Sequence, residues 1–176
     1  MKIYTKEDKI VIADFNEVEA LRVALKLEND GIKFYLKAAQ IAEVPEIKEI
    51  FKKLVKEEEG HVEIFQNYLQ KIINAKKLEI EAEPGYEESF FDYVETGVFA
   101  DLMDMEKTLG RMKCASDVVN FAEGVEVASI NFYKAMLDKT ENAAGKTNLK
   151  NIIEEEQKHL KTFIRYKELI EKKEKK

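Results

Sequence analysis

The sequence contains very little cysteine, proline and glycine, and each shortage excludes a class of protein. A single cysteine, Cys114, cannot form an intramolecular disulfide or a four-cysteine metal centre. Two prolines and seven glycines among 176 residues are too few for a turn-rich all-β fold or a disordered chain. With 45% hydrophobic and 36% charged residues, the composition favours a helical protein, and the cytoplasm is its expected location.

Long hydrophobic runs and basic stripes are also missing. No apolar run approaches the roughly 20 residues of a membrane-spanning helix. The N-terminal MKIYTKEDKIVIADF interrupts its apolar residues with charges and has no small-residue cleavage site, so it predicts no signal peptide. The formal net charge is −6 and the lysines are spread out, which leaves no stripe to neutralise phosphates. We therefore expect neither a membrane nor a nucleic acid as partner.

Four long stretches carry apolar residues at alternating spacings of three and four, which is typical of helices that bury one stripe. Short links join the first to the second and the third to the fourth, so each pair forms an antiparallel hairpin. The sequence predicts one all-α domain over residues 1–176, a four-helix bundle of two hairpins. The predicted helices cover about 15–43, 46–75, 116–139 and 146–173.

Local signals set the helix ends. Pro45 suits the first turn of the second helix, Ser116 is a candidate N-cap of the third, and NAAGK at 142–146 predicts a break before the fourth. Before the first helix, KIVIA at 9–13 is a candidate short strand.

Residues 76–115 form a long crossover between the two hairpins, and they are too apolar for a free linker. We expect additional helices there, packed on the bundle or on a second subunit. As an assembly we expect a homodimer or a larger homo-oligomer. The apolar side chains that would line one face of such a helix are Phe99, Leu102, Met103, Leu109 and Met112.

A shift of 98 residues aligns both hairpins without a gap. The sequence therefore contains two copies of one helical hairpin, related by an approximate two-fold axis. The aligned polar and aromatic residues include Glu28 with Glu126, Tyr35 with Tyr133, Glu57 with Glu155, Glu58 with Glu156, and His61 with His159.

Both histidines of the chain follow a glutamate by three positions, and both pairs continue the apolar stripe of their helix. Matching glutamates lie on the stripes of the first and third helices. The third helix carries one further inward glutamate, Glu123, where the first has Leu25. The inward set is Glu28, Glu58, His61, Glu126, Glu156 and His159, with Glu123 as a seventh member.

Carboxylates buried together require a positive partner, because an unpaired buried charge costs several kcal/mol. The four stripes have no lysine or arginine at this level, which leaves a metal. One glutamate from each of two helices and a Glu-x-x-His pair from each of the other two is the donor set of ferritin-like di-iron and di-manganese proteins. We predict two iron ions, with manganese or zinc as alternatives.

Some positions have two interpretations. A single Glu-x-x-His in a glutamate-rich helix is common on a solvated face, but two copies in phase with the core are not expected by chance. Glu57 and Glu155 lie off the stripe, and face either solvent or the backs of the metal ligands. The hydroxyls of Tyr35 and Tyr133 either donate to a carboxylate or belong to ordinary core aromatics.

The four helices resemble the rubrerythrin branch of the ferritin-like superfamily, through ALKLENDGIKFY, KEEEGHVEIF, NFAEGVEVASINFY and IEEEQKHLKTF. Ferritins and bacterioferritins share the six-ligand pattern, whereas the glutamate Glu123 before Glu126, in EGVE, is similar to the rubrerythrin arrangement. The resemblance implies reduction of hydrogen peroxide at a non-haem di-iron centre held by the seven positions. It also implies that Glu123 is a mobile glutamate that changes partner with the oxidation state of iron, beside His61.

Typical rubrerythrins add a rubredoxin domain with four cysteines, so we expect an external electron-transfer protein such as a rubredoxin. The candidate catalytic residues are Glu123, Tyr35 and Tyr133. One alternative is a ferroxidase that uses dioxygen and supplies iron storage. Another is a structural or partner-binding helical protein with a vestigial or zinc-filled site.

Overall fold

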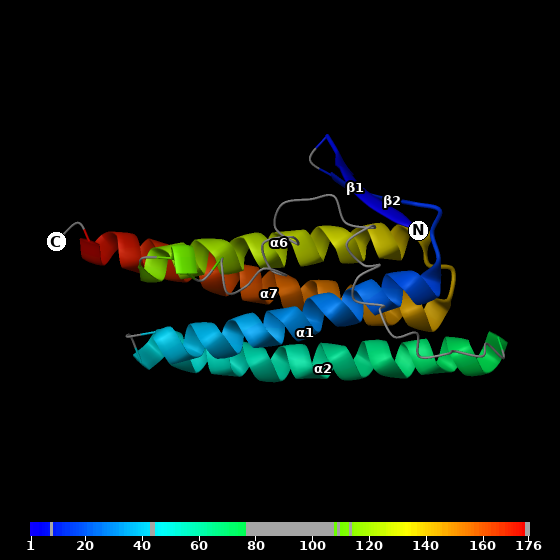
Figure 1. Ribbon diagram of the computed structural model, residues 1–176, viewed down its shortest axis with the longest axis horizontal. Coiled ribbons are helices and arrows are strands. Elements are labelled where there is room, and N and C mark those ends of the chain that lie inside the picture. Colours follow the sequence, from blue (N-terminus) through cyan, green and yellow to red (C-terminus); the bar gives the residue numbers. More distant parts are fainter. Residues whose placement is uncertain (8, 43–44, 77–107, 109, 113, 175–176) are drawn as a thin grey trace.

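Four long helices lie along one another and form the body of the molecule (Figure 1). The computed structural model describes residues 1–7, 9–42, 45–76, 108, 110–112 and 114–174. The predicted all-α class and four-helix bundle are confirmed. The elements are β1 (Lys2–Lys6), β2 (Lys9–Ala13), α1 (Glu17–Ile41), α2 (Pro45–Lys76), α6 (Ala115–Lys139) and α7 (Ala143–Glu174).

Each of these helices begins and ends within three residues of its predicted limits. Helix α1 starts after Asn16, whose side chain accepts hydrogen bonds from the backbone N–H groups of Val18 at 3.0 Å and Glu19 at 3.2 Å. This N-cap satisfies backbone donors that have no partner inside the helix. Pro45 is the first residue of α2, as the sequence predicted.

The predicted start of α6 is wrong by one residue. Ser116 lies inside the helix, and the N-cap is Cys114. The backbone N–H of Cys114 donates to Oδ2 of Asp117 at 3.3 Å, so an acidic residue in the first turn satisfies a backbone donor at the start of the helix.

The predicted break before α7 lies slightly earlier than the NAAGK segment: residues 140–142 are not helical, and the helix begins at Ala143 inside that segment. Asn142 precedes it and accepts a hydrogen bond from the backbone N–H of Gly145 at 2.9 Å. The glycine has a packing role: a Cβ atom at position 145 would lie 2.0 Å from the hydroxyl of Tyr68 on α2. The sequence signal was therefore an N-cap followed by a close helix contact.

The predicted strand at KIVIA is confirmed as β2, and it pairs antiparallel with β1, which we did not predict. Ile3 lies opposite Ile12 in this ribbon, and both side chains are buried. The ribbon packs on α6 (Figure 1). Ile3 and Ile12 belong to the same hydrophobic core as the buried helix residues, so the ribbon extends that core beside α6.

The core is built from two tightly packed hairpins, α1 with α2 and α6 with α7. The hairpins meet along α1 and α6 and along α2 and α7. Aromatic rings repeat across this contact: Tyr35 lies 6.0 Å from Phe163 between ring centroids, and the equivalent Tyr133 lies 5.3 Å from Phe65. The approximate two-fold repeat of the sequence is thus a repeat of packing.

Most of the predicted crossover helix lies outside the described residues. This applies to Phe99, Leu102, Met103 and Leu109, whereas Met112 is described and packs against the core. Among the described residues, no helix has an apolar stretch of the length that a bilayer crossing requires.

Candidate metal centre

Six of the predicted ligands meet in the middle of the bundle, and all six side chains are buried. They form two overlapping groups, and in each group the candidate ligand atoms lie within 4.8 Å of one another. Glu58 and Glu156 belong to both groups, so each is placed to bridge two ions. The groups are Glu28, Glu58, His61 and Glu156, and Glu126, Glu156, His159 and Glu58; together they are called the cluster below.

The two histidine rings face the cluster through the same nitrogen. Nδ1 of His61 lies 2.8 Å from Glu58 and 3.3 Å from Glu156. Nδ1 of His159 lies 3.1 Å from Glu156 and 3.3 Å from Glu58. Each ring also has the glutamate of its own hairpin's other helix at 3.7 Å, Glu28 for His61 and Glu126 for His159. The two halves of the cluster therefore have matching geometry.

Tyr35 and Tyr133 donate hydrogen bonds to cluster carboxylates, and each reaches across to the other hairpin. Tyr133 donates to Glu28 at 2.5 Å, and Tyr35 donates to Glu126. Both rings are also buried core aromatics, so the two interpretations of these residues hold together. Burial raises the pKa of both hydroxyls well above its usual range, which keeps them protonated and able to donate.

Without a bound cation, the cluster has to hold protons. Burial raises the pKa of Glu28 to about 8, with a further contribution from the charge of Glu58. Burial and neighbouring carboxylates raise the pKa of Glu156 well above its usual range. Burial acts the same way on Glu58, but hydrogen bonds from both histidine rings hold its pKa below the usual range. Burial opposes protonation of His61 and His159, but their carboxylate partners outweigh it and raise both pKa values.

The donor set fits two divalent transition-metal ions. Carboxylate oxygens and imidazole nitrogens are ligands that iron, manganese and zinc accept, and each of the two groups offers three carboxylates and one imidazole. Bound cations would replace the protons that burial now forces onto Glu28 and Glu156. The chemistry of the cluster therefore matches a two-metal centre.

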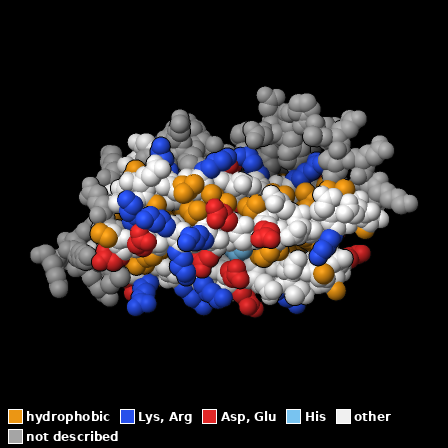
Figure 2. Space-filling view, turned by 90° about the horizontal axis from the view of Figure 1, so that it is seen from below, with side chains coloured by type: hydrophobic (Ala, Val, Ile, Leu, Met, Phe, Trp, Pro, Cys, Tyr) orange, Lys and Arg blue, Asp and Glu red, His pale blue; other side chains and the backbone are white. Residues whose placement is uncertain are grey.

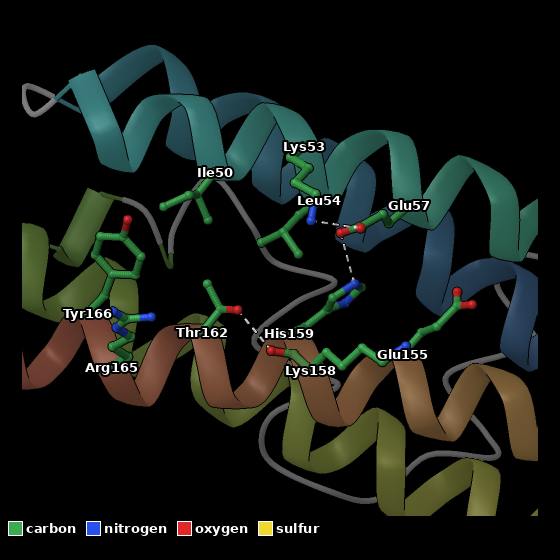
Figure 3. Close-up of a pocket in the computed structure, with 10 residues that line it drawn as sticks. All are labelled: Ile50, Lys53, Leu54, Glu57, Glu155, Lys158, His159, Thr162, Arg165 and Tyr166. Atoms are coloured by element: carbon green, nitrogen blue, oxygen red, sulfur yellow. Dashed lines mark hydrogen bonds and ion pairs between the residues drawn. The ribbon is translucent and has the colours of Figure 1, made fainter.

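Glu57 and Glu155, called the outer carboxylates below, contact the histidines from the side away from the cluster. Nε2 of His61 lies 2.9 Å from Glu155, and Nε2 of His159 lies 3.2 Å from Glu57. Figure 3 shows His159 on α7 pointing at Glu57 on α2, which also pairs with Lys53. The sequence left two interpretations open here, and the structure places these side chains between the rings and solvent.

A surface cavity of about 720 Å³ lies between α2 and α7 and reaches this outer layer. Its lining includes Glu57, Glu155 and His159 (Figure 3). Seen from below, histidine is visible near the middle of this face between acidic and basic side chains (Figure 2). On this side, the histidine rings and the outer carboxylates lie between the buried cluster carboxylates and the cavity.

The seventh predicted ligand, Glu123, is not brought into the cluster. Its carboxylate pairs with Nζ of Lys167 on α7 at 3.2 Å, and the side chain is 28% exposed. Our expectation of an inward carboxylate considered only lysines on the helix stripes, and Lys167 follows the stripe residue Tyr166 by one position. A long lysine side chain can reach a partner from a flanking position, and this flexibility escapes a pattern based on spacing.

Comparisons with known proteins agree with this geometry. The sequence matches the rubrerythrin family over residues 19–167. A crystal structure from Thermotoga maritima, assigned to the ferritin-like diiron-carboxylate proteins, shares 26% identity with a TM-score of 0.63, over 88% of this chain and 95% of that one. A hypothetical protein from Pyrococcus furiosus shares 21% identity with a TM-score of 0.64, over 90% and 92%. The search of curated proteins finds no match.

A third similar structure, a hypothetical protein from Methanococcus jannaschii, shares 15% identity with a TM-score of 0.64, over 95% of this chain and 86% of that one. The helix arrangement and the overlapping Glu/His groups define a ferritin-like four-helix bundle with a candidate di-metal centre. The chain belongs to the rubrerythrin family.

Proposed function

We propose that this protein is a di-iron oxidoreductase that reduces hydrogen peroxide with electrons from a separate protein such as a rubredoxin. The observation that supports it most directly is the buried cluster, whose two groups share Glu58 and Glu156. Two ferrous ions held there would supply the two electrons that cleavage of an O–O bond requires. Reduction of one peroxide to two waters also consumes two protons.

The side chains around the cluster have separate tasks in this proposal. Glu58 and Glu156 would each contribute to holding both metal ions, because each belongs to both groups. Tyr35 and Tyr133 donate to Glu126 and Glu28, which holds these terminal carboxylates in one orientation.

Glu123 is the proposed mobile glutamate. It lies one helical turn before Glu126, on the stripe that faces the cluster, and its partner Lys167 is partly exposed. Ion pairs at such positions contribute about 0–1 kcal/mol, so exchanging Lys167 for a metal costs little. The proposal therefore assigns Glu123 two positions, one on Lys167 and one on the metal centre.

A ferroxidase is the second candidate, and one observation favours it. While Glu123 is paired with Lys167, the cluster has six donor residues, which resembles the six-ligand pattern of ferritins and bacterioferritins. A ferroxidase would oxidise ferrous ions with dioxygen and release the product for storage.

Anaerobic reconstitution with ferrous iron tests both candidates. We expect two irons per chain, and faster oxidation of the reduced protein by hydrogen peroxide than by dioxygen, measured by stopped-flow absorbance. The Glu58→Ala, Glu156→Ala double variant is the matched control for iron held elsewhere. Faster reaction with dioxygen than with peroxide would favour the ferroxidase, and a wild-type protein that binds no metal would leave a structural role.

A further inference from the structure

We propose that the outer carboxylates, Glu57 and Glu155, are positioning residues that hold each histidine as a metal ligand from the opposite hairpin. Each would fix the orientation of one ring and the nitrogen that carries its proton. The inference rests on the metal centre of the proposed function, but it does not depend on peroxide as substrate.

The two nitrogens of each ring have different surroundings. Nδ1 of His61 and of His159 faces the cluster carboxylates, whereas Nε2 faces an outer carboxylate. The side chain of His61 is 1% exposed and its partner Glu155 is 47% exposed. The side chain of His159 is 5% exposed and its partner Glu57 is 34% exposed. The outer carboxylates therefore separate both rings from solvent.

A neutral imidazole has one N–H group and one nitrogen lone pair. An acceptor at Nε2 favours the tautomer with the proton on Nε2, which leaves the Nδ1 lone pair directed at the cluster for a metal. Such an acceptor also resists rotation of the ring about its Cβ–Cγ bond. The orientation of each ring is therefore set before a metal arrives, and once a metal takes the place of the Nδ1 proton, the outer carboxylate holds the remaining proton on Nε2.

The contacts are reciprocal, and this separates them from an accidental surface pair. His61 on α2 meets Glu155 on α7, and at the same offset of 98 residues His159 on α7 meets Glu57 on α2. Each contact crosses between the hairpins where α2 and α7 face each other. The approximate two-fold axis thus repeats the outer layer as well as the cluster.

The two contacts differ in strength. Glu57 also pairs with Lys53 at 3.1 Å, whereas the position equivalent to Lys53 in the second hairpin is Asn151, which has no charge. The contact between Glu155 and His61 is also the shorter of the two, at 2.9 Å against 3.2 Å. We therefore expect a larger effect from Glu155→Ala than from Glu57→Ala.

Cobalt(II) binding tests the proposal without turnover. Co²⁺ is titrated into wild type, the two alanine variants and the corresponding glutamine variants, with visible absorption as the readout. Glu59→Ala and Glu154→Ala are matched controls, because they remove the same charge from exposed neighbouring positions on α2 and α7. The alanine variants should bind Co²⁺ about 10–100-fold more weakly than these controls. The glutamine variants should recover most of the loss, because an amide oxygen still accepts from Nε2–H.

Proton NMR of the Co²⁺-loaded protein provides the spectroscopic readout. Wild type should show two paramagnetically shifted ring N–H signals that vanish in D₂O, one from each histidine. Glu155→Ala should broaden only the His61 signal through faster exchange, and Glu57→Ala only that of His159. The melting temperature of each metal-free variant is compared with that of its control. Values within a few degrees of each other would establish that the bundle is intact.

Three results would overturn the inference. Alanine variants with the affinity and NMR signals of their controls would show that the outer carboxylates are only solvated. Glutamine variants as weak as the alanine variants would show an effect of charge and not of an acceptor at Nε2. Absence of Co²⁺ binding by wild type would remove the inference together with the proposed function, whereas the first two results leave the proposed function standing.

Discussion

The α1–α2 and α6–α7 hairpins have the same side chains in the cluster and different ones a turn away. At the offset of 98 residues, the ion pair between Glu123 and Lys167 in the second hairpin corresponds to Leu25 and Leu69 in the first. Both leucines pack against the core. The cluster residues are the same in both hairpins, whereas a position one turn away can differ. In the second hairpin that position carries a charged pair where the first has two leucines.

The largest expected effect comes from breaking what the two hairpins share. Glu58→Ala or Glu156→Ala removes a donor from both groups, so each variant should bind both ions more weakly. The loss should exceed the roughly 10–100-fold that is typical when a residue hydrogen-bonded to a metal ligand is removed. Glu28→Ala removes a donor from one group only. Calorimetric titration with Co²⁺ measures the number of sites and their affinities. Equal loss at one site alone in all three variants would contradict the bridging positions.

Metal should couple the two hairpins, because each group takes donors from both. At a thousandfold excess over its Kd, a ligand that binds only the folded state contributes about 4 kcal/mol. For a chain of this size the melting temperature should rise by about 8–16 °C. Calorimetric melting of metal-loaded and chelator-treated protein measures the shift. The Glu58→Ala, Glu156→Ala double variant, which should show little shift, is the control for metal at the surface.

The metal-free protein should lose stability as the pH rises from about 5 to 8.5. The pKa of Glu28 is about 8 in the folded state and 4.5 in the reference state, so its contribution is complete below about 4.5 and is lost as the pH passes 8. The raised histidine pKa values act in the same direction above 6.5, and Glu58, with a lowered pKa, stays ionised throughout this range. The free energy of unfolding, from urea titrations, should fall by a few kcal/mol.

The metal-loaded protein should not lose stability over the same pH range, because rising pH removes the protons that compete with the metal. A metal-free form whose stability is flat or increases with pH would contradict the buried proton on Glu28. The Glu28→Gln variant, which cannot ionise at this position, should have the shallower pH dependence.

The sequence predicted the bundle and the six cluster residues because helical periodicity and the repeat both act over many residues. A polar side chain in phase with an apolar stripe is placed by the helix itself. The direction of each contact was harder to predict. Tyr35 lies on the same helix as Glu28, but its hydroxyl meets Glu126, because the crossing of the two hairpins decides which carboxylate is within reach.

The same limit applies to charges at the edge of the stripe. The roles of Glu57 and Glu155 depend on the distance between α2 and α7, which no periodicity contains. The repeat nevertheless aligned this pair at the same offset as the histidines, and that alignment was the available signal. For Glu123, the competing principle was the reach of a flexible lysine from a flanking position.

The smallest effect on the fold, and the sharpest on activity, should come from making the second hairpin like the first. In a Glu123→Leu, Lys167→Leu double variant, an apolar pair replaces an ion pair that contributes about 0–1 kcal/mol, so the melting temperature should change by only a few degrees. The six cluster donors remain, and iron stoichiometry should stay at two per chain. If Glu123 moves onto the metal centre during the reaction, peroxide consumption by the reduced protein should fall about tenfold or more, which corresponds to about 1.4 kcal/mol in the barrier. Lys167→Leu alone is the matched control, because it frees Glu123 without removing it and should keep or increase the rate. Unchanged peroxide consumption by the double variant at full iron occupancy would remove Glu123 from the mechanism, and the six-donor ferroxidase would then be the better proposal.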